Sequence, residues 1–304
     1  MTDPVGRDAE GPAAAPTTSA AVDVADAADA AVRMRGVGRV FTTDDHATTT
    51  ALKDIDLDIG RGEFVSLIGP SGCGKSTLLR IVGDLIAPSS GEVLVNGKAA
   101  VRARRDRDYG MVFQAPVLFE WRTVEDNVKL PLEVMGYDAA RRASRAREML
   151  DLVELGDFSG HRPWQLSGGM QQRVAIARAL AFEASILLMD EPFGALDEMT
   201  RERMNQEVQR IWQQTGITIL FVTHSIPEAV FLSSRVVVMS ARPGQITHVI
   251  DIDLPRPRTD DTRETERYFE LVTAVREALR GRKPDTDGEG SASSRRTLAE
   301  GAVG

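Results

Sequence analysis

The sequence predicts an α/β fold with a mixed or parallel core sheet, a smaller antiparallel sheet and a helical subdomain. Nearly continuous apolar runs, typical of strands buried on both faces, indicate the parallel part: FVSLI at 64–68, SILLM at 185–189, ITILFV at 217–222 and RVVVM at 235–239. Alternating apolar and polar residues indicate the antiparallel sheet; they occur in DIDLDI at 54–59 and in GEVLVNGK at 91–98, which contains an Asn-Gly turn. Helical spacing between 123 and 183 predicts the helical subdomain, with bounds of about 116–180.

Composition limits the classes of protein that this chain can represent. Its 304 residues are 42% apolar, which is enough to bury a sizeable core. The formal net charge of −8 argues against a nucleic-acid-binding protein, whose surface is usually basic. No apolar stretch reaches the roughly 18 residues of a membrane-spanning helix, and the N-terminus lacks the pattern of a secretory signal. The single cysteine excludes an internal disulfide and fits a reducing cytoplasm.

The two ends of the sequence differ in composition from the middle. Residues 1–31 are mostly Ala, Asp, Thr and Pro, and residues 282–304 are equally poor in material for a core. We expect both segments to be disordered, because neither can bury enough apolar surface to offset the entropy of ordering. The folded part is expected to comprise a main domain at 32–258 and a helical extension at 259–281. One face of this extension should pack on the main domain, and its apolar residues are Tyr268, Leu271, Val272, Val275 and Leu279.

A glycine-rich loop is the first chemical motif. The stretch GPSGCGKST at 69–77 contains the pattern G-x-x-x-x-G-K-[ST] between an apolar run and a helical segment. Its glycines allow successive backbone N–H groups to face phosphate oxygens, while Lys75 would add charge at the β- and γ-phosphates of ATP and Ser76 an oxygen for Mg²⁺. The alternative, a chance glycine turn, is disfavoured by the flanking strand and helix. The expected nucleotide-binding residues are Gly69, Pro70, Ser71, Gly72, Cys73, Gly74, Lys75, Ser76 and Thr77.

Two adjacent acids follow a predicted buried strand in ILLMDEP at 186–192. Carboxylates at this point lie at the carboxyl edge of the sheet, where open α/β sheets bind ligands. We expect Asp190 to hold Mg²⁺, through water, and Glu191 to position or deprotonate the attacking water. The alternative interpretation is that these two acids lie in a solvated turn after the strand. The phosphate loop upstream argues against that interpretation.

A second serine- and glycine-containing stretch, QLSGGMQQRVAIARAL at 165–180, opens a predicted helix. By itself, Ser167 is typical of a helix N-cap. Together with the phosphate loop, LLMDEP, GALD at 194–197 and TH at 223–224, this stretch resembles the ATP-binding subunit of ABC transporters over about 33–258. The resemblance implies a P-loop ATPase fold of ABC type and a head-to-tail dimer. In such a dimer Ser167, Gly168 and Gly169 would face the γ-phosphate of ATP held by the partner, helped by the helix dipole.

The resemblance assigns further site residues one at a time. Gln114, after the apolar YGMVF, would contact Mg²⁺ or the attacking water and respond to the transmembrane partner; otherwise it is an exposed polar loop residue. Asp197 would link the two ATP sites across the dimer, although an Asp at such a point is often a helix cap. His224 would contact the γ-phosphate and Phe41 would stack on adenine, while either could instead be structural. Met170 replaces the glutamine that the family most often has, a change expected to matter only near the ribose.

Longer stretches resemble one group of importers, those for nitrate, sulfonate and taurine, which also includes systems for thiamine precursors. They are LFEWRTVEDNVKLPLEVMG after Gln114, the pairing of LSGGM with DEPFGALD, and MSARPGQITHVIDIDLPRPR at 239–258. This resemblance implies a homodimeric peripheral subunit at the cytoplasmic face of the cell membrane, which energises permease subunits served by an external solute-binding protein. An exporter subunit and a soluble ABC ATPase without a transport role are the alternatives. The single glycine loop and its short distance from the LSGGM stretch argue against a soluble ABC ATPase without a transport role.

Cys73 lies inside the phosphate loop and has two interpretations. Proximity to Lys75 and to the following helix N-terminus would favour a reactive thiolate. Burial as a small hydrophobic filler would oppose ionisation. The sequence leaves both open.

Overall fold

The computed structural model describes residues 30–42 and 47–281. The expected disorder at 1–31 and 282–304 therefore lies outside the described residues, apart from Ala30 and Ala31. These two residues belong to the first strand, because Ala30 pairs with Gly60 and the side chain of Ala31 is buried. The folded part thus begins earlier than residue 32, the start that composition predicts.

The core sheet has the strand order β10-β9-β3-β8-β7-β6. The strands from β9 to β6 are parallel and β10 pairs antiparallel to β9, so the sheet is mixed. All four apolar runs form central strands, as predicted. The bounds are β3 (Phe64–Ile68), β6 (Tyr109–Val112), β7 (Ile186–Asp190), β8 (Thr218–Val222), β9 (Arg235–Met239) and β10 (Ile246–Asp251).

A second, antiparallel sheet has the order β2-β1-β4-β5, which confirms the small sheet predicted from alternation. Ile55, Leu57 and Ile59 point into the core from β2, where alternation placed them. Asn96 and Gly97 join β4 to β5 with φ of 50° and 74°, the left-handed angles that a two-residue hairpin turn requires. The bounds are β1 (Ala30–Thr42), β2 (Thr48–Gly60), β4 (Ser90–Val95) and β5 (Lys98–Ala99).

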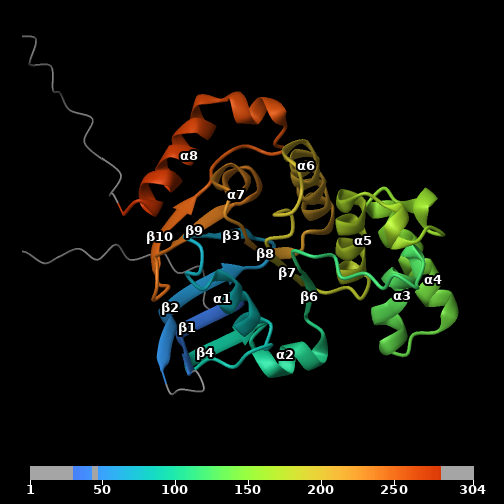
Figure 1. Ribbon diagram of the computed structural model, residues 1–304, viewed down its shortest axis with the longest axis horizontal. Coiled ribbons are helices and arrows are strands. Elements are labelled where there is room, and N and C mark those ends of the chain that lie inside the picture. Colours follow the sequence, from blue (N-terminus) through green and yellow to red (C-terminus); the bar gives the residue numbers. More distant parts are fainter. Residues whose placement is uncertain (1–29, 43–46, 282–304) are drawn as a thin grey trace, which may run out of the picture.

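The helical segment between 123 and 183 contains α3 (Val124–Val134), α4 (Ala139–Leu152) and α5 (Gly168–Leu180), which pack together on one side of the molecule (Figure 1). Thr123 and Asp138 cap α3 and α4 by accepting hydrogen bonds from backbone N–H groups three residues later. The remaining α-helices are α1 (Lys75–Val82), α2 (Ala100–Asp106), α6 (Glu198–Thr215), α7 (Ile226–Leu232) and α8 (Glu266–Leu279). Short 3₁₀ helices occur at Gly156–Phe158, Pro163–Gln165 and Asp260–Glu264.

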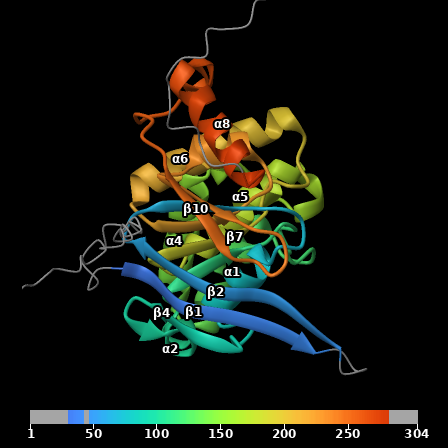
Figure 2. The same ribbon diagram turned by 90° about the vertical axis from the view of Figure 1, so that its left-hand side faces the viewer.

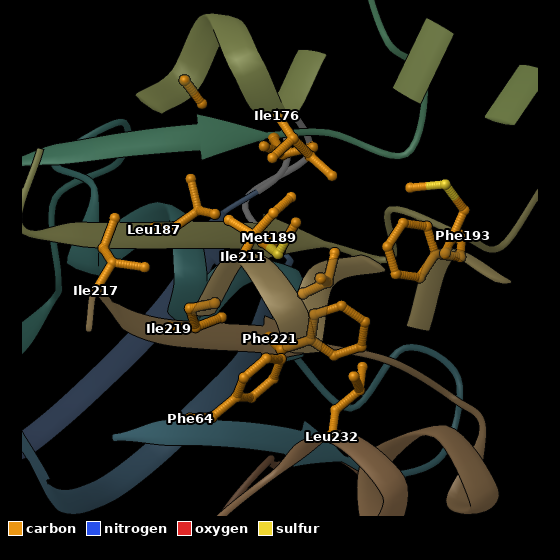
Figure 3. Close-up of a cluster of buried hydrophobic side chains, with 14 of the residues drawn as sticks. Phe64, Ile176, Leu187, Met189, Phe193, Ile211, Ile217, Ile219, Phe221 and Leu232 are labelled. Atoms are coloured by element: carbon orange, nitrogen blue, oxygen red, sulfur yellow. The ribbon is translucent and has the colours of Figure 1, made fainter. Parts of the chain in front are cut away.

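Two apolar clusters cover the faces of the core sheet. One cluster includes Phe64, Phe193 and Phe221, whose rings pack at centroid distances of 5.8–5.9 Å (Figure 3). The other lies between the core sheet, α1 and the antiparallel sheet. Figure 2 shows the antiparallel sheet at one end of the molecule and α8 at the opposite end. The apolar face of α8 packs on α7, β9 and β10, as predicted, with Tyr268, Leu271, Val272 and Val275 buried and Leu279 partly buried.

Candidate nucleotide site

The phosphate loop joins the carboxyl end of β3 to α1. Gly74 caps α1 with φ of 101°, in the left-handed region that favours glycine, and an added Cβ would lie 2.7 Å from Leu52 Cδ2. Lys75 is only 5% exposed. Its Nζ donates to the carbonyls of Gly69 at 2.8 Å and Pro70 at 3.2 Å. The ammonium group is therefore held within the loop, where it adds positive charge to the helix N-terminus.

Asp190 ends β7 beside the start of α1. Ser76 Oγ donates to its Oδ1 at 2.6 Å, although the two residues are 114 positions apart in the chain. Arg80 Nη2 lies 3.9 Å from Asp190 Oδ2. The structure thus joins the phosphate loop to the first of the two predicted acids at the carboxyl edge of the sheet.

Glu191 follows Asp190 with φ of 47°, a sparsely populated angle for a residue with a side chain. Its backbone N–H donates to Val222 O at 3.0 Å, which connects the residue to the end of β8. Its Oε2 lies 3.2 Å from Nδ1 of His224, in the loop that follows β8. Two of the expected catalytic side chains therefore lie within hydrogen-bonding distance of each other.

The position of His224 depends on the residues on either side of it. Thr223 Oγ1 donates to a carboxyl oxygen of Glu228, and Ser225 N donates to Thr223 Oγ1 at 3.0 Å. Glu228 is buried in α7, and this burial raises the pKa of its carboxyl group, with the Thr223 hydrogen bond and nearby cations acting against the increase. The loop carrying His224 is consequently anchored to a buried acid that sequence reasoning did not single out.

Two adjoining cavities surround these residues. The larger, of about 470 Å³, is lined by Phe41, Glu191 and much of the phosphate loop. One face of the Phe41 ring carries the guanidinium group of Arg39, at 4.6 Å from the ring centroid. The second cavity contains Gln114, Ser76, Asp190 and Glu191 among its lining residues. The structure therefore brings Phe41 and Gln114 to the phosphate loop, as expected.

The oxygen atoms of the second cavity suit Mg²⁺, which prefers carboxylate, hydroxyl and carbonyl ligands. Ser76 supplies a hydroxyl oxygen, Gln114 an amide carbonyl oxygen and Asp190 a carboxylate. Within residues 30–42 and 47–281, no group of three or more His, Cys, Asp or Glu side chains could hold a metal ion. A magnesium ion at this edge would thus depend on these three residues together with nucleotide and water.

Ser167 and Asp197 are both helix N-caps, as the simpler interpretation of each predicts. Ser167 Oγ accepts from Met170 N at 3.3 Å, and Asp197 Oδ1 accepts from Thr200 N at 3.0 Å, a bond that lowers the pKa of the Asp197 carboxyl. Both residues are exposed. The two helix starts are in contact, because a Cβ on Gly169 would lie 2.8 Å from Thr200 Cγ2.

Neither Ser167 nor its two following glycines line the cavities at the phosphate loop, as far as the described residues show. The LSGGM stretch therefore does not complete the phosphate site of its own chain. One indirect link to that site is a hydrogen bond from Gln172 of α5, whose Nε2 donates to Phe113 O at 3.0 Å, next to Gln114.

Sequence reasoning missed two residues that the structure places at the site. Gln172 is a polar residue on the buried side of α5, a signal that was present in the sequence. Arg242 lines the larger cavity from the loop between β9 and β10. The only sequence signal for Arg242 was the stretch MSARPG, which has no spacing relation to the phosphate loop.

Cys73 is 1% exposed and packs in the apolar cluster behind the phosphate loop. Its Sγ lies 3.8 Å from Lys75 Nζ. This burial favours the interpretation of Cys73 as a small hydrophobic filler.

A phosphate loop between β3 and α1, with an acid pair at the end of the buried strand β7 of the same sheet, defines a P-loop nucleotide-binding ATPase. Comparison with known proteins agrees. The ABC transporter family model matches residues 52–194. The nitrate import ATP-binding protein NrtD of Synechocystis sp. is 44% identical over 255 residues, covering 82% of this chain and 95% of the relative. The taurine import ATP-binding protein TauB of Roseobacter denitrificans is 47% identical over 230 residues, covering 75% and 85%.

Solved structures support the same assignment. The dimeric structure of a post-hydrolysis state of the ATP-binding cassette MJ0796, bound to ADP and Pi, is 37% identical. It aligns with a TM-score of 0.63 over 73% of this chain and 98% of the other. The chain belongs to the ABC transporter family of ATP-binding proteins. It binds ATP and is an ATPase, as the sequence predicts.

Proposed function

We propose that this chain is the ATP-hydrolysing subunit of an ABC importer for a small solute. The observation that carries the proposal is the combination of a phosphate loop facing an acid pair with relatives that are named for nitrate and taurine import. The solute is expected to resemble nitrate, a sulfonate, taurine or a thiamine precursor. A permease and an external solute-binding protein would select it.

The exposed positions of Ser167 and Asp197 support a head-to-tail homodimer. Each ATP would lie between the phosphate loop of one copy and the Ser167–Gly169 segment of the other. The second copy would supply the donors that the cavity of one chain lacks, at a helix N-terminus that favours negative charge. Two copies would therefore enclose two ATP molecules.

Within each site we assign roles from position. Phe41 would stack on adenine with the ring face that Arg39 does not cover, and Lys75 would neutralise charge at the β- and γ-phosphates. Glu191 would position or deprotonate the attacking water, while His224 holds the glutamate and contacts the γ-phosphate. Bound Mg²⁺ would offset phosphate charge, held by Ser76, Gln114 and Asp190.

An apolar groove offers a place for the permease. It encloses about 440 Å³ between α3, α5 and β6, with Val134 76% exposed at its edge. Arg178 lines the groove and donates to the carbonyls of Pro116 and Val117 at 2.8 Å each, just after Gln114. A helical segment of the permease in this groove would therefore press on the loop that carries Gln114. This contact would hold the subunit at the cytoplasmic face of the membrane. Among the described residues, no helix has the length and apolar character of a membrane span.

Reconstitution tests the proposal. The subunit would be co-purified with its permease and placed in vesicles with ATP on the subunit's side. We expect uptake of labelled nitrate, taurine or another sulfonate, or a thiamine precursor, that stops with Glu191→Gln. Val134→Arg should abolish co-purification while the isolated subunit still hydrolyses ATP. Efflux of solute would indicate an exporter, and hydrolysis without any permease association would indicate a non-transport ATPase.

A further inference from the structure

The loop between β9 and β10, residues 240–245, lies directly against the phosphate loop. Arg242 Nε donates to Gly72 O at 2.8 Å. Gly244 N donates to Ala51 O at 2.9 Å, and a Cβ on Gly244 would lie 2.0 Å from Cys73 O. Only glycine permits this approach, so the loop is seated on the phosphate loop by backbone contact.

The same loop is held in one shape by its own hydrogen bonds. Ser240 Oγ donates to Pro243 O at 3.0 Å and accepts from Gln245 N at 3.0 Å. A residue of β2 also holds the loop, because Lys53 N donates to Gly244 O at 3.0 Å. Arg242 therefore extends from a backbone that is fixed relative to both the phosphate loop and β2, which limits the conformations open to its side chain.

Arg242 lines the nucleotide cavity and brings its guanidinium group to the phosphate loop. It shares the cavity with Lys75, Thr77 and Phe41. The Nε atom of Arg242 donates a hydrogen bond to Gly72 O, and a Cβ added at Gly72 would lie 3.0 Å from Arg242 Nη2. Within residues 30–42 and 47–281, no hydrogen bond engages Nη1 or Nη2. The group thus offers unused N–H donors at the mouth of a phosphate site.

We propose that Arg242 is a nucleotide-binding residue that donates to phosphate oxygens of bound ATP. Its anchor on Gly72 places it at the phosphate loop, whereas Phe41 and Thr49 line the cavity from the antiparallel sheet. A guanidinium group with one nitrogen anchored and two free is well suited to charge-assisted hydrogen bonds with phosphate. The loop between β9 and β10 would then add a second cation to the charge of Lys75. The inference rests on ATP binding at this cavity.

The test is ligand binding by purified Arg242→Ala, Arg242→Lys and Arg242→Gln, with Arg276→Ala as a control. Arg276 is exposed on α8, so its substitution changes the net charge equally but far from the cavity. We expect ATP to bind Arg242→Ala about tenfold to a hundredfold more weakly, the size expected for lost charge-assisted hydrogen bonds. GTP should lose as much, adenosine should lose nothing, and the ATPase reaction should show raised KM with little change in kcat.

The conservative variants distinguish a phosphate contact from a purely structural contact. Glutamine can still donate to Gly72 O but carries no charge, whereas lysine keeps the charge. A phosphate contact predicts partial retention with lysine and loss with glutamine. Wild-type affinity in Arg242→Gln, or equal losses for ATP and adenosine, would overturn the proposal. Failure of the unmodified protein to bind ATP would instead count against the nucleotide site itself.

Discussion

Glu191 and His224 face each other across the ends of two adjacent parallel strands, with Oε2 and Nδ1 3.2 Å apart. Glu191 reaches this point with φ of 47°, and its N–H is bonded to the strand that leads to His224. A carboxyl group that is hydrogen-bonded to a neighbouring imidazole can adopt fewer orientations. The pair therefore suits a base that must meet one water molecule in one place.

Replacing Glu191 with glutamine should separate binding from hydrolysis. The amide keeps the size of the side chain but cannot accept a proton, so ATP hydrolysis should fall roughly a hundredfold or more. ATP binding should persist, and ATP-dependent dimers should accumulate in gel filtration. Steady-state phosphate release by the assembled transporter is the measurement. Near-normal turnover would contradict the role of Glu191.

Mixed dimers test whether each ATP site is shared between two chains. Lys75→Ala damages the phosphate loop and Ser167→Arg damages the segment proposed to face the partner's ATP. In a dimer of one chain of each kind, one site carries both lesions and the other carries neither. We expect neither variant alone to form an ATP-bound dimer, and the mixture to bind one ATP per mixed dimer in equilibrium titration. If no mixing ratio restores binding, the sites are contained within single chains.

Cys73 should be a poor target for alkylation despite its position in the phosphate loop. Its side chain is 1% exposed, so reaction requires local opening, and maleimide labelling of the native protein should be on the order of a hundredfold slower than labelling in denaturant. Prolonged labelling should abolish ATPase activity, and saturating Mg-ATP should protect. Cys73→Ser should hydrolyse ATP normally and resist the reagent. Mass spectrometry that shows rapid, complete modification with full activity would contradict this placement.

Glu228 should make stability depend on pH. Burial raises its pKa in the folded state, so keeping it ionised there is unfavourable. Below the unfolded-state pKa of about 4.3, Glu228 is neutral in both the folded and the unfolded state, and the folded state carries no such penalty. As the pH rises through the folded-state pKa, the penalty appears and the free energy of unfolding falls. Glu228→Gln should therefore unfold at a higher temperature than the wild type at pH 8, with the difference shrinking toward pH 4. Thermal denaturation across this range checks the sign; a difference that grows in acid would contradict it.

Arg258 should be a large contributor to stability. It is 4% exposed, and its guanidinium group donates to backbone carbonyls around the end of α7 instead of to an acid. Replacement by methionine would leave these carbonyls buried without donors, and should lower the free energy of unfolding by about 3 kcal/mol or more. Urea denaturation should show this loss, and Arg276→Met should show almost none. The carbonyls belong to Val230, Phe231, Ser233, Ile252 and Leu254.

Local patterns predicted much of the fold and the candidate site. The four apolar runs and the Asn96-Gly97 turn are confirmed because strand burial and turn angles depend on a few adjacent residues. The phosphate loop and the acids at 190 and 191 could be placed for the same reason. Each motif directly follows a recognisable strand, and the carboxyl ends of parallel strands meet at one edge of a sheet.

The sequence determined which segments would carry the chemistry, whereas the tertiary structure decided which of them would meet. β3 lies between β8 and β9, strands more than 150 residues further along the chain, and no local pattern encodes that order. The order brings Glu191 to His224. It also carries the loop after β9 back to the phosphate loop, so that Arg242 reaches Gly72 across 170 positions. Such contacts arise because burying both faces of one sheet forces distant segments together.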